Sequence, residues 1–140
     1  MDIRNLNVTD YDNYINHIKT NVTHDVYNNF VSNVLSDYHK IIVVIINNLI
    51  IGSGTIIIER KMTHNGCKMG HIENILVDEH YRNKGIGAKI INELHQIAKL
   101  SGCYRIDLIC SNDLINYYKK IIPDVIEQSG LTIMIPENYN

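Results

Sequence analysis

The feature that most constrains the fold is the stretch from Gly70 to Ala88, in which a strand, a short basic glycine loop and a helix follow one another directly. Ile75 and Val77 are among the apolar residues that predict the strand, and the helical pattern follows Gly85 and Gly87. Glycines allow the amides of such a loop to turn inward, and the first turn of a helix leaves its amides unpaired at the positive end of the dipole. The stretch therefore predicts an anion site suited to a diphosphate.

Two familiar phosphate-binding motifs do not fit this loop. The segment Arg82–Gly87 lacks the third glycine of the dinucleotide fingerprint, and Lys89 has neither the preceding glycine spacing nor the following Ser or Thr of a P-loop. An ordinary strand-to-helix turn is the remaining alternative. The loop resembles the Arg/Gln-x-x-Gly-x-Gly/Ala loop of the GNAT acetyltransferases, which implies that it holds the diphosphate of acetyl-CoA.

The chain outside this stretch shows alternating helical and strand-like patterns. Thr9 suits a helix N-cap, with Asp12 three residues later. Asn47 and Asn48 separate two continuous apolar runs, which predicts a hairpin of strands covered on both faces. The expected elements outside the stretch are a strand over 3–8, helices over 14–18 and 25–35, strands on either side of 47–48, a strand over Cys103–Cys110, a helix ended by Pro123 and a closing strand over Leu131–Ile135.

These elements predict an α/β fold with a GNAT-like, mixed, mostly antiparallel sheet flanked by helices on both faces. The helix after the glycine loop carries one apolar stripe, and Gly102 suits its C-terminal end. A length of 140 residues favours a single domain over 1–140.

Composition excludes several other classes of protein. A formal net charge of −2 argues against broad nucleic-acid binding, and the apolar run around residues 41–58 is too interrupted to span a bilayer. The N-terminus lacks a signal-peptide pattern, and Cys67, Cys103 and Cys110 lack metal-site spacing, so we expect free thiols and a cytoplasmic protein. The scattered histidines predict no metal site.

The central two-thirds of the chain resembles one GNAT family, the glucosamine-6-phosphate N-acetyltransferases. The matching segments are Ile57–Lys61, His64, Gly70–Asn74, Gly102–Ile106 and Tyr117–Lys120. The resemblance implies transfer of acetyl from acetyl-CoA to the 2-amino group of glucosamine 6-phosphate, a step of UDP-N-acetylglucosamine biosynthesis, by direct attack of the amine on the thioester. It also implies a homodimer.

The resemblance assigns roles to individual residues. Tyr118 would protonate the CoA thiolate, and Glu73 would orient the amine or accept its proton through a water; a core tyrosine and a solvent-facing strand residue are the plain alternatives. The residues expected to bind acetyl-CoA are Ile75, Leu76, Val77, Arg82, Asn83, Lys84, Gly85, Ile86, Gly87 and Ala88. The residues expected to bind the sugar phosphate are Thr20, Lys61, His64, Glu73, Asn74 and Asp107.

The sugar half of the site departs from the family pattern. Ile109 stands where the family has an acidic residue, and Asp107, two residues earlier, is the possible substitute. Leu114 replaces an expected asparagine, and no arginine follows Arg105, where the family has one for the phosphate. Two alternatives therefore stay open: a GNAT enzyme for a different small amine, and a CoA-binding module without catalysis.

Overall fold

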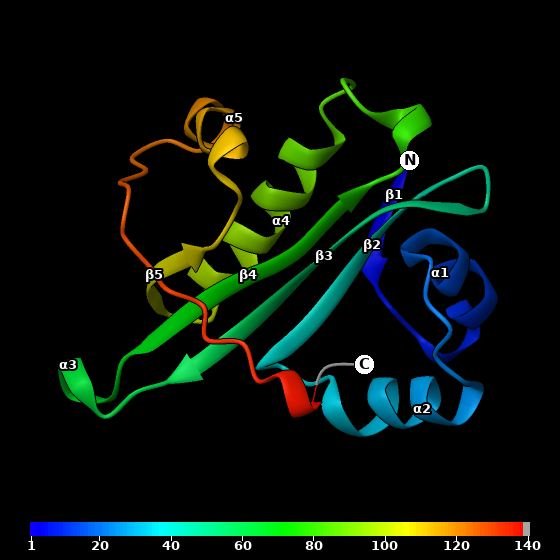
Figure 1. The fold of residues 1–140 in the computed structure, drawn as a ribbon, viewed down its shortest axis with the longest axis horizontal. Helices are drawn as coiled ribbons and strands as arrows, with labels where there is room; N and C mark the ends of the chain where they lie inside the picture. Colours follow the sequence, from blue (N-terminus) through cyan, green and yellow to red (C-terminus); the bar gives the residue numbers. More distant parts are fainter. Residues whose placement is uncertain (139–140) are drawn as a thin grey trace. The chain divides into compact units, whose positions relative to one another are not determined.

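The computed structural model describes residues 1–138, which divide into a compact unit over residues 1–108 and a second unit from Ile109 onward. In the described residues of the first unit, a five-stranded sheet has the strands in chain order (Figure 1). They are β1 (Asp2–Asn5), β2 (His39–Ile46), β3 (Leu49–Arg60), β4 (Lys68–Val77) and β5 (Cys103–Leu108).

The sheet is mixed and mostly antiparallel, as the sequence predicts. Successive strands are antiparallel from β1 to β4, whereas β4 and β5 are parallel. A parallel pair needs a long crossover connection, and helix α4 (Ile86–Leu100) provides it. The predicted hairpin turn is also confirmed, because Asn47 and Asn48 both have positive φ angles, 51° and 64°, as a two-residue turn between β2 and β3 requires.

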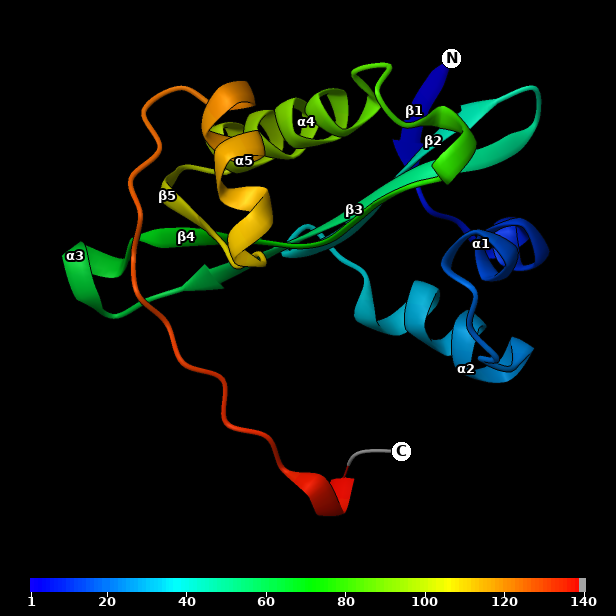
Figure 2. The same cartoon turned by 45° about the horizontal axis from the view of Figure 1, so that its top comes forward.

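Helices cover both faces of the sheet, as predicted. Figure 2 shows α4 on one face and α1 (Tyr11–Ile18) and α2 (His24–Asn29) on the other, with a π-helical turn over Phe30–Val34 extending α2. On the α1–α2 face the buried core contains Leu6, Tyr27, Ile41, Val43 and Ile50. Burying a side chain of this size contributes about 1.5–3 kcal/mol, so these contacts fix both helices on the sheet.

Helix α4 packs closely on the sheet because β3 has glycines beneath it. A β-carbon at Gly54 would lie 2.6 Å from Ile90 Cγ2 and 2.8 Å from Ile75 Cδ1, and one at Gly52 would lie 3.0 Å from Ile90 Cδ1. Ile90 itself is fully buried. The glycines therefore set the height of α4, and with it the position of the glycine loop at its N-terminus.

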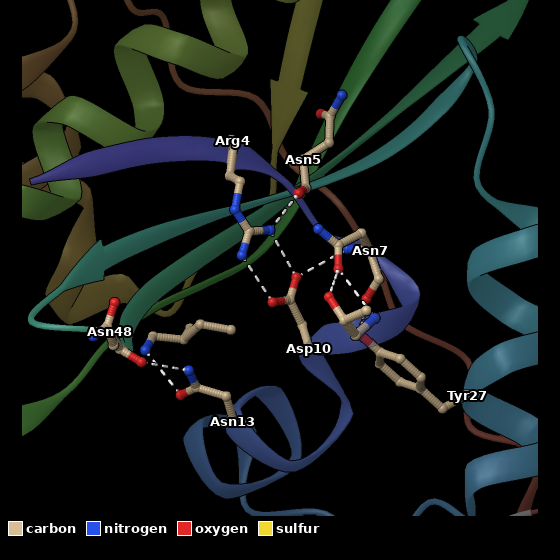
Figure 3. A network of polar contacts seen from close by, with 9 residues as sticks. Arg4, Asn5, Asn7, Asp10, Asn13, Tyr27 and Asn48 are labelled. Carbon is tan, nitrogen blue, oxygen red and sulfur yellow. Dashed lines mark hydrogen bonds and ion pairs between the residues drawn. The ribbon is translucent and has the colours of Figure 1, made fainter.

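The start of α1 differs from the sequence prediction, because the N-cap at Thr9 with Asp12 is wrong. Asn7 caps a 3₁₀ turn over Val8–Asp10 that leads into α1, and the Asn7 backbone amide donates a hydrogen bond to the Asp10 carboxylate. Figure 3 shows the reason: Asp10 is held by both terminal nitrogens of Arg4, at 2.7 and 2.8 Å. Because this bidentate pair fixes Asp10, the capping box starts at Asn7, two residues before the predicted N-cap at Thr9.

The predicted fifth strand is confirmed from Cys103 onward, but its predicted end at Cys110 and the predicted closing strand over Leu131–Ile135 are wrong. Strand β5 ends at Leu108, so Ile109 and Cys110 follow the strand instead of closing it. Residues 131–135 have no regular structure, and Leu131 is 99% exposed. An apolar, alternating segment forms a strand only where another strand pairs with it, and no strand within residues 1–138 does so.

The second unit contains the predicted last helix. Helix α5 (Ile115–Ile121) follows a 3₁₀ turn over Asn112–Leu114, and Pro123 lies just beyond its C-cap residue Ile122, as predicted. A further 3₁₀ turn covers Pro136–Asn138.

Candidate active site

Strand β4 contains a bulge at the position where the sequence predicts the reacting groups. Ser53 of β3 pairs with Leu76 and Thr55 pairs with Glu73, so that Gly54 alone faces both Asn74 and Ile75. Asn74 has a φ of 53°, a left-handed conformation that asparagine tolerates better than most residues. An extra residue of this kind bends the strand and redirects the side chains beside it.

Beyond the bulge, β4 has an open edge. Its pairing with β5 ends at Ile72 and Leu108, and within the described residues no strand pairs with Glu73–Val77 on that side. The backbone of Ile75, Leu76 and Val77 therefore presents an unpaired edge. An extended ligand that carries amides can hydrogen-bond to such an edge as an added strand would.

The glycine loop directly follows this edge and has the backbone of an anion site. Asn83 and Gly85 have φ angles of 61° and 78°, and Gly85 is the N-cap of α4 without any side-chain cap. The first bond of the helix runs from the Lys89 amide to the Gly85 carbonyl at 3.1 Å. Within residues 1–138, no amide from Asn83 to Ala88 donates to a protein acceptor, so these donors at the positive end of α4 fit a diphosphate.

Two cationic side chains flank the loop. Arg82 Nε donates to the Val77 carbonyl at 3.1 Å, which ties the loop to the end of β4. The Lys84 ammonium lies 5.3 Å from the centre of the Tyr81 ring. The structure thus joins the predicted diphosphate loop and the predicted thioester strand into one continuous surface.

A polar cluster occupies the other end of the same strands. Glu59 Oε1 lies 2.9 Å from His71 Nε2, and Glu59 Oε2 accepts from Lys61 Nζ at 3.3 Å. The hydrogen bond from His71, followed by that from Lys61, lowers the pKa of Glu59 below its usual value. Lys61 is therefore already paired with a carboxylate, a contact that sequence reasoning missed although Glu59 lies in the motif with Lys61.

Asp107 and His64, two further predicted sugar-binding residues, lie on elements next to these strands. Asp107 of β5 is the register partner of His71 and pairs with Arg105 at 3.3 Å. His64 lies in the left-handed turn labelled α3 (Thr63–Gly66), and its ring centre is 5.1 Å from that of Tyr104.

Thr20 lies on a separate element from these residues. It follows Lys19, the left-handed residue that ends α1, at the start of the loop to α2. The contacts of the described residues do not link it to Lys61 or Glu73.

Tyr118 lies on α5 in the second unit. Burial, followed by the neighbouring Cys110 and Tyr117, raises the pKa of its phenol. The Tyr117 ring packs edge-on at 5.2 Å, and the adjacent Lys119 forms an ion pair with Glu127. A phenol with a raised pKa keeps its proton at neutral pH, which is what a proton donor needs.

The described residues form neither a metal-binding cluster nor a membrane-spanning helix. In residues 1–138, no group of three or more His, Cys, Asp or Glu side chains is placed to hold a metal ion. None of the helices in that range is both long and apolar enough to cross a bilayer.

Comparison with known proteins agrees with this geometry. Residues 2–121 match the model of the acetyltransferase (GNAT) family. The chain is 30% identical to the glucosamine 6-phosphate N-acetyltransferase of Candida albicans over 127 residues, which cover 84% of this chain and 85% of that protein. It is 39% identical over 71 residues to the probable glucosamine 6-phosphate N-acetyltransferase 2 of Oryza sativa subsp. japonica, covering 51% of this chain and 43% of the rice protein.

The fold comparison extends over nearly the whole chain. The crystal structure of glucosamine-6-phosphate N-acetyltransferase from Arabidopsis thaliana superposes with a TM-score of 0.81 at 28% identity, covering 93% of this chain and 97% of that one. The match to the family model, the similarity to the Candida protein over more than four fifths of both chains and the shared fold lead to one conclusion: this chain belongs to the GNAT acetyltransferase family.

Proposed function

We propose that this protein transfers the acetyl group of acetyl-CoA to the 2-amino group of glucosamine 6-phosphate. The observation that carries the proposal is the continuity of the open β4 edge with the unpaired amides of the glycine loop, because one extended thioester ligand with a diphosphate would satisfy both. The relatives named for this activity support the choice of acceptor. The match to the family model spans residues of both units, which supports a single acetyltransferase domain.

In this proposal the coenzyme is bound mainly by backbone. Ile75, Leu76 and Val77 pair with its amide-bearing arm and hold the thioester carbonyl. The loop residues hold its diphosphate through their amides and two positive charges: Arg82, Asn83, Lys84, Gly85, Ile86, Gly87 and Ala88. Backbone donors fixed by a strand and a helix lose little entropy on binding, so the thioester is held ready for attack.

The chemistry needs no covalent enzyme intermediate. The amine nitrogen attacks the thioester carbon, the C–S bond breaks, and the amine proton passes to Glu73 directly or through a water. Tyr118 donates its phenolic proton to the leaving thiolate, a role supported by its raised pKa. Glu73 is exposed on β4 beside the bulge, and Asn74, the next residue, is proposed to bind the acceptor sugar near its amine.

The sugar phosphate is the part of the acceptor that the site favours least. Lys61 and His64 are its proposed ligands, with Thr20 and Asp107 toward the sugar. Since Lys61 is paired with Glu59 at 3.3 Å, a phosphate dianion would have to share the Lys61 ammonium with that carboxylate or displace it. This pairing favours a second candidate function, acetylation of a small amine that carries no phosphate.

We also infer a homodimer and a cytoplasmic location. The exposed apolar side chains of Leu131, Ile133 and Ile135 in the second unit support an interface with another copy. Cys67, Cys103 and Cys110 are free thiols, which supports a reducing compartment.

The test is a thiol-release assay of the purified protein with acetyl-CoA and a panel of amines. Glucosamine 6-phosphate should give the highest kcat/KM, and glucosamine, which lacks only the phosphate, is the matched acceptor control. A preference for glucosamine or another unphosphorylated amine would replace the acceptor with the second candidate. Calorimetric binding of acetyl-CoA without turnover of any amine would indicate a coenzyme-binding module.

A further inference from the structure

A buried histidine of α1 contacts β3 directly beside Gly54, the residue that faces the β4 bulge. His17 of α1 is 8% exposed, and its Nε2 lies 3.0 Å from Ser53 Oγ, which is itself buried. Ser53 pairs with Leu76, the middle residue of the open edge. The side chain of His17 is therefore one hydrogen bond and one strand pairing away from the backbone proposed to hold the thioester.

The bulge is fixed from both faces of the sheet. On one face, Ile90 of α4 packs against Gly54 at the centre of the bulge. On the other face, His17 is hydrogen-bonded to Ser53, the residue next to Gly54. Ser53 also pairs with Val43 of β2, which belongs to the core beneath α1 and α2. Loss of either contact leaves the bulge free to shift toward that face.

His17 also lies at the end of its helix. Ile18 is the last residue of α1, and the left-handed Lys19 turns the chain into the loop that carries Thr20. The imidazole thus links the end of α1, where this loop starts, to Ser53 of β3, which pairs with Leu76 of the open β4 edge.

The second nitrogen of this ring is costly to bury. Among the described residues, His17 Nδ1 is buried without a hydrogen-bond partner. Burial lowers the pKa of His17 from its ordinary value of 6.5, while Asp78 after β4 opposes the shift; the Tyr14 ring lies 6.4 Å away on the same helix. An apolar side chain would avoid the cost of the unpaired nitrogen, so the bond to Ser53 has a use beyond packing.

We propose that His17 is a positioning residue. Through Ser53 it sets the geometry of β4, whose open edge is proposed to hold the coenzyme, and it couples this strand to the loop that carries Thr20. This proposal rests on the proposed function, in that the β4 edge holds the thioester. A displacement of about 1 Å at a reacting group costs on the order of a hundredfold in rate, so a loosened bulge should lower turnover more than it lowers stability.

The helix offers a matched control four residues earlier. Asn13 lies on the same side of α1 and also binds β3: its amide donates to the Asn48 carbonyl at 2.9 Å and its oxygen accepts from the Ile50 amide at 2.9 Å. These bonds fix α1 to the hairpin turn, away from the bulge. Asn13→Ala therefore removes polar contacts between α1 and β3 without touching Ser53.

The experiment compares His17→Ala, Ser53→Ala and Asn13→Ala by thermal unfolding, acetyl-CoA calorimetry and steady-state kinetics. We expect His17→Ala and Ser53→Ala to lower kcat/KM for acetyl-CoA by about ten- to a hundredfold, and Asn13→Ala to lower only the melting temperature. His17→Gln, whose amide falls near the position of Nε2, should recover part of the rate, whereas His17→Asn should not. Equal losses in the His17 and Asn13 variants, or unchanged rates for His17→Ala, would overturn the proposal.

A pH profile separates positioning from packing. Protonation of His17 would make Nδ1 a buried charged donor without an acceptor, so wild-type kcat/KM should fall as the pH drops below the lowered pKa of His17. His17→Gln should not show this fall in kcat/KM at acid pH. If kcat/KM fell at the same pH in His17→Gln and in the wild type, the positioning role of His17 would be contradicted. If the wild type turns over no amine, selective weakening of acetyl-CoA binding by His17→Ala still supports the positioning role while the proposed acetyl transfer fails.

Discussion

Gly54 and Ile90 approach each other so closely that a β-carbon on the glycine would lie 2.6 Å from Ile90 Cγ2. The contact joins β3, the strand that faces the β4 bulge, to the helix that follows the glycine loop. Both halves of the proposed coenzyme site therefore depend on this contact between β3 and α4.

Replacing Gly54 with alanine should push α4 away from β3. We expect a loss of about 1–3 kcal/mol in the free energy of unfolding, because the inserted carbon overpacks a rigid contact, and a weaker affinity for acetyl-CoA. Urea unfolding and calorimetry measure the two effects. Gly70→Ala is the control: its β-carbon would lie 3.3 Å from Ile106 Cγ1, a contact that a small shift relieves. Equal effects of the two substitutions would contradict this account.

Replacing Gly85 with alanine should damage the diphosphate site directly. With φ at 78°, alanine is strained by about 1–2 kcal/mol, and the realigned amides should weaken acetyl-CoA binding by about tenfold or more. Gly102→Ala is a close match, since Gly102 has φ at 83° at the other end of α4 and neither glycine has an atom within 4 Å of the added carbon. Both variants should lose similar stability, but only Gly85→Ala should lose affinity.

Tyr118→Phe tests the proton donor. Without the phenol, the thiolate leaves unprotonated, so kcat should fall by about a hundredfold while the dissociation constant of acetyl-CoA stays the same. Burial raises the pKa of this phenol above its ordinary value of 10.0, so the wild-type rate should decline only at alkaline pH. Tyr117→Phe should behave as wild type, and equal turnover in Tyr118→Phe would assign the proton to another donor.

The Arg4–Asp10 pair predicts a distinct acid sensitivity. Arg4 lowers the pKa of Asp10 below its ordinary value of 3.8, so its stabilisation is present above that pH and is lost as the pH falls through the lowered value. Asp10→Asn should cost about 1–2 kcal/mol at pH 7, since Arg4 is partly exposed, and should remove this acid-dependent component. Asp12→Asn, an exposed change of equal charge, should alter neither. Denaturant unfolding from pH 2 to pH 7 measures both.

The exposed segment around Leu131 predicts the oligomeric state. Changing Leu131 and Ile133 to serine should convert a dimer into a monomer in sedimentation experiments, because both side chains are almost fully exposed in a single chain. Met62→Ser, at an apolar side chain 97% exposed in the first unit, should leave the dimer intact. A monomeric wild type would remove the inferred homodimer.

Local patterns predict the strand, loop and helix of the proposed coenzyme site and the Asn47–Asn48 turn, because the signals lie within a few residues of one another. They did not predict the bulge, since Asn74 adopts its left-handed conformation only where Gly54 of another strand faces it. The N-cap at Asn7 depends on Arg4 pairing with Asp10. The Leu131 segment shows the converse, because an alternating apolar pattern requires a partner strand that its own sequence does not specify.

The unpaired edge of β4 has a consequence for handling the protein. On the side of Glu73–Val77 that faces away from β3, no strand within residues 1–138 pairs with the backbone, and such an edge is a template on which a strand of any other chain can add, the first step of edge-to-edge aggregation. A thioester ligand lying along this edge would block that growth. Preparations stripped of coenzyme should therefore precipitate at lower concentrations than saturated ones, and the coenzyme would act as a protective cap for the sheet as well as an acyl donor.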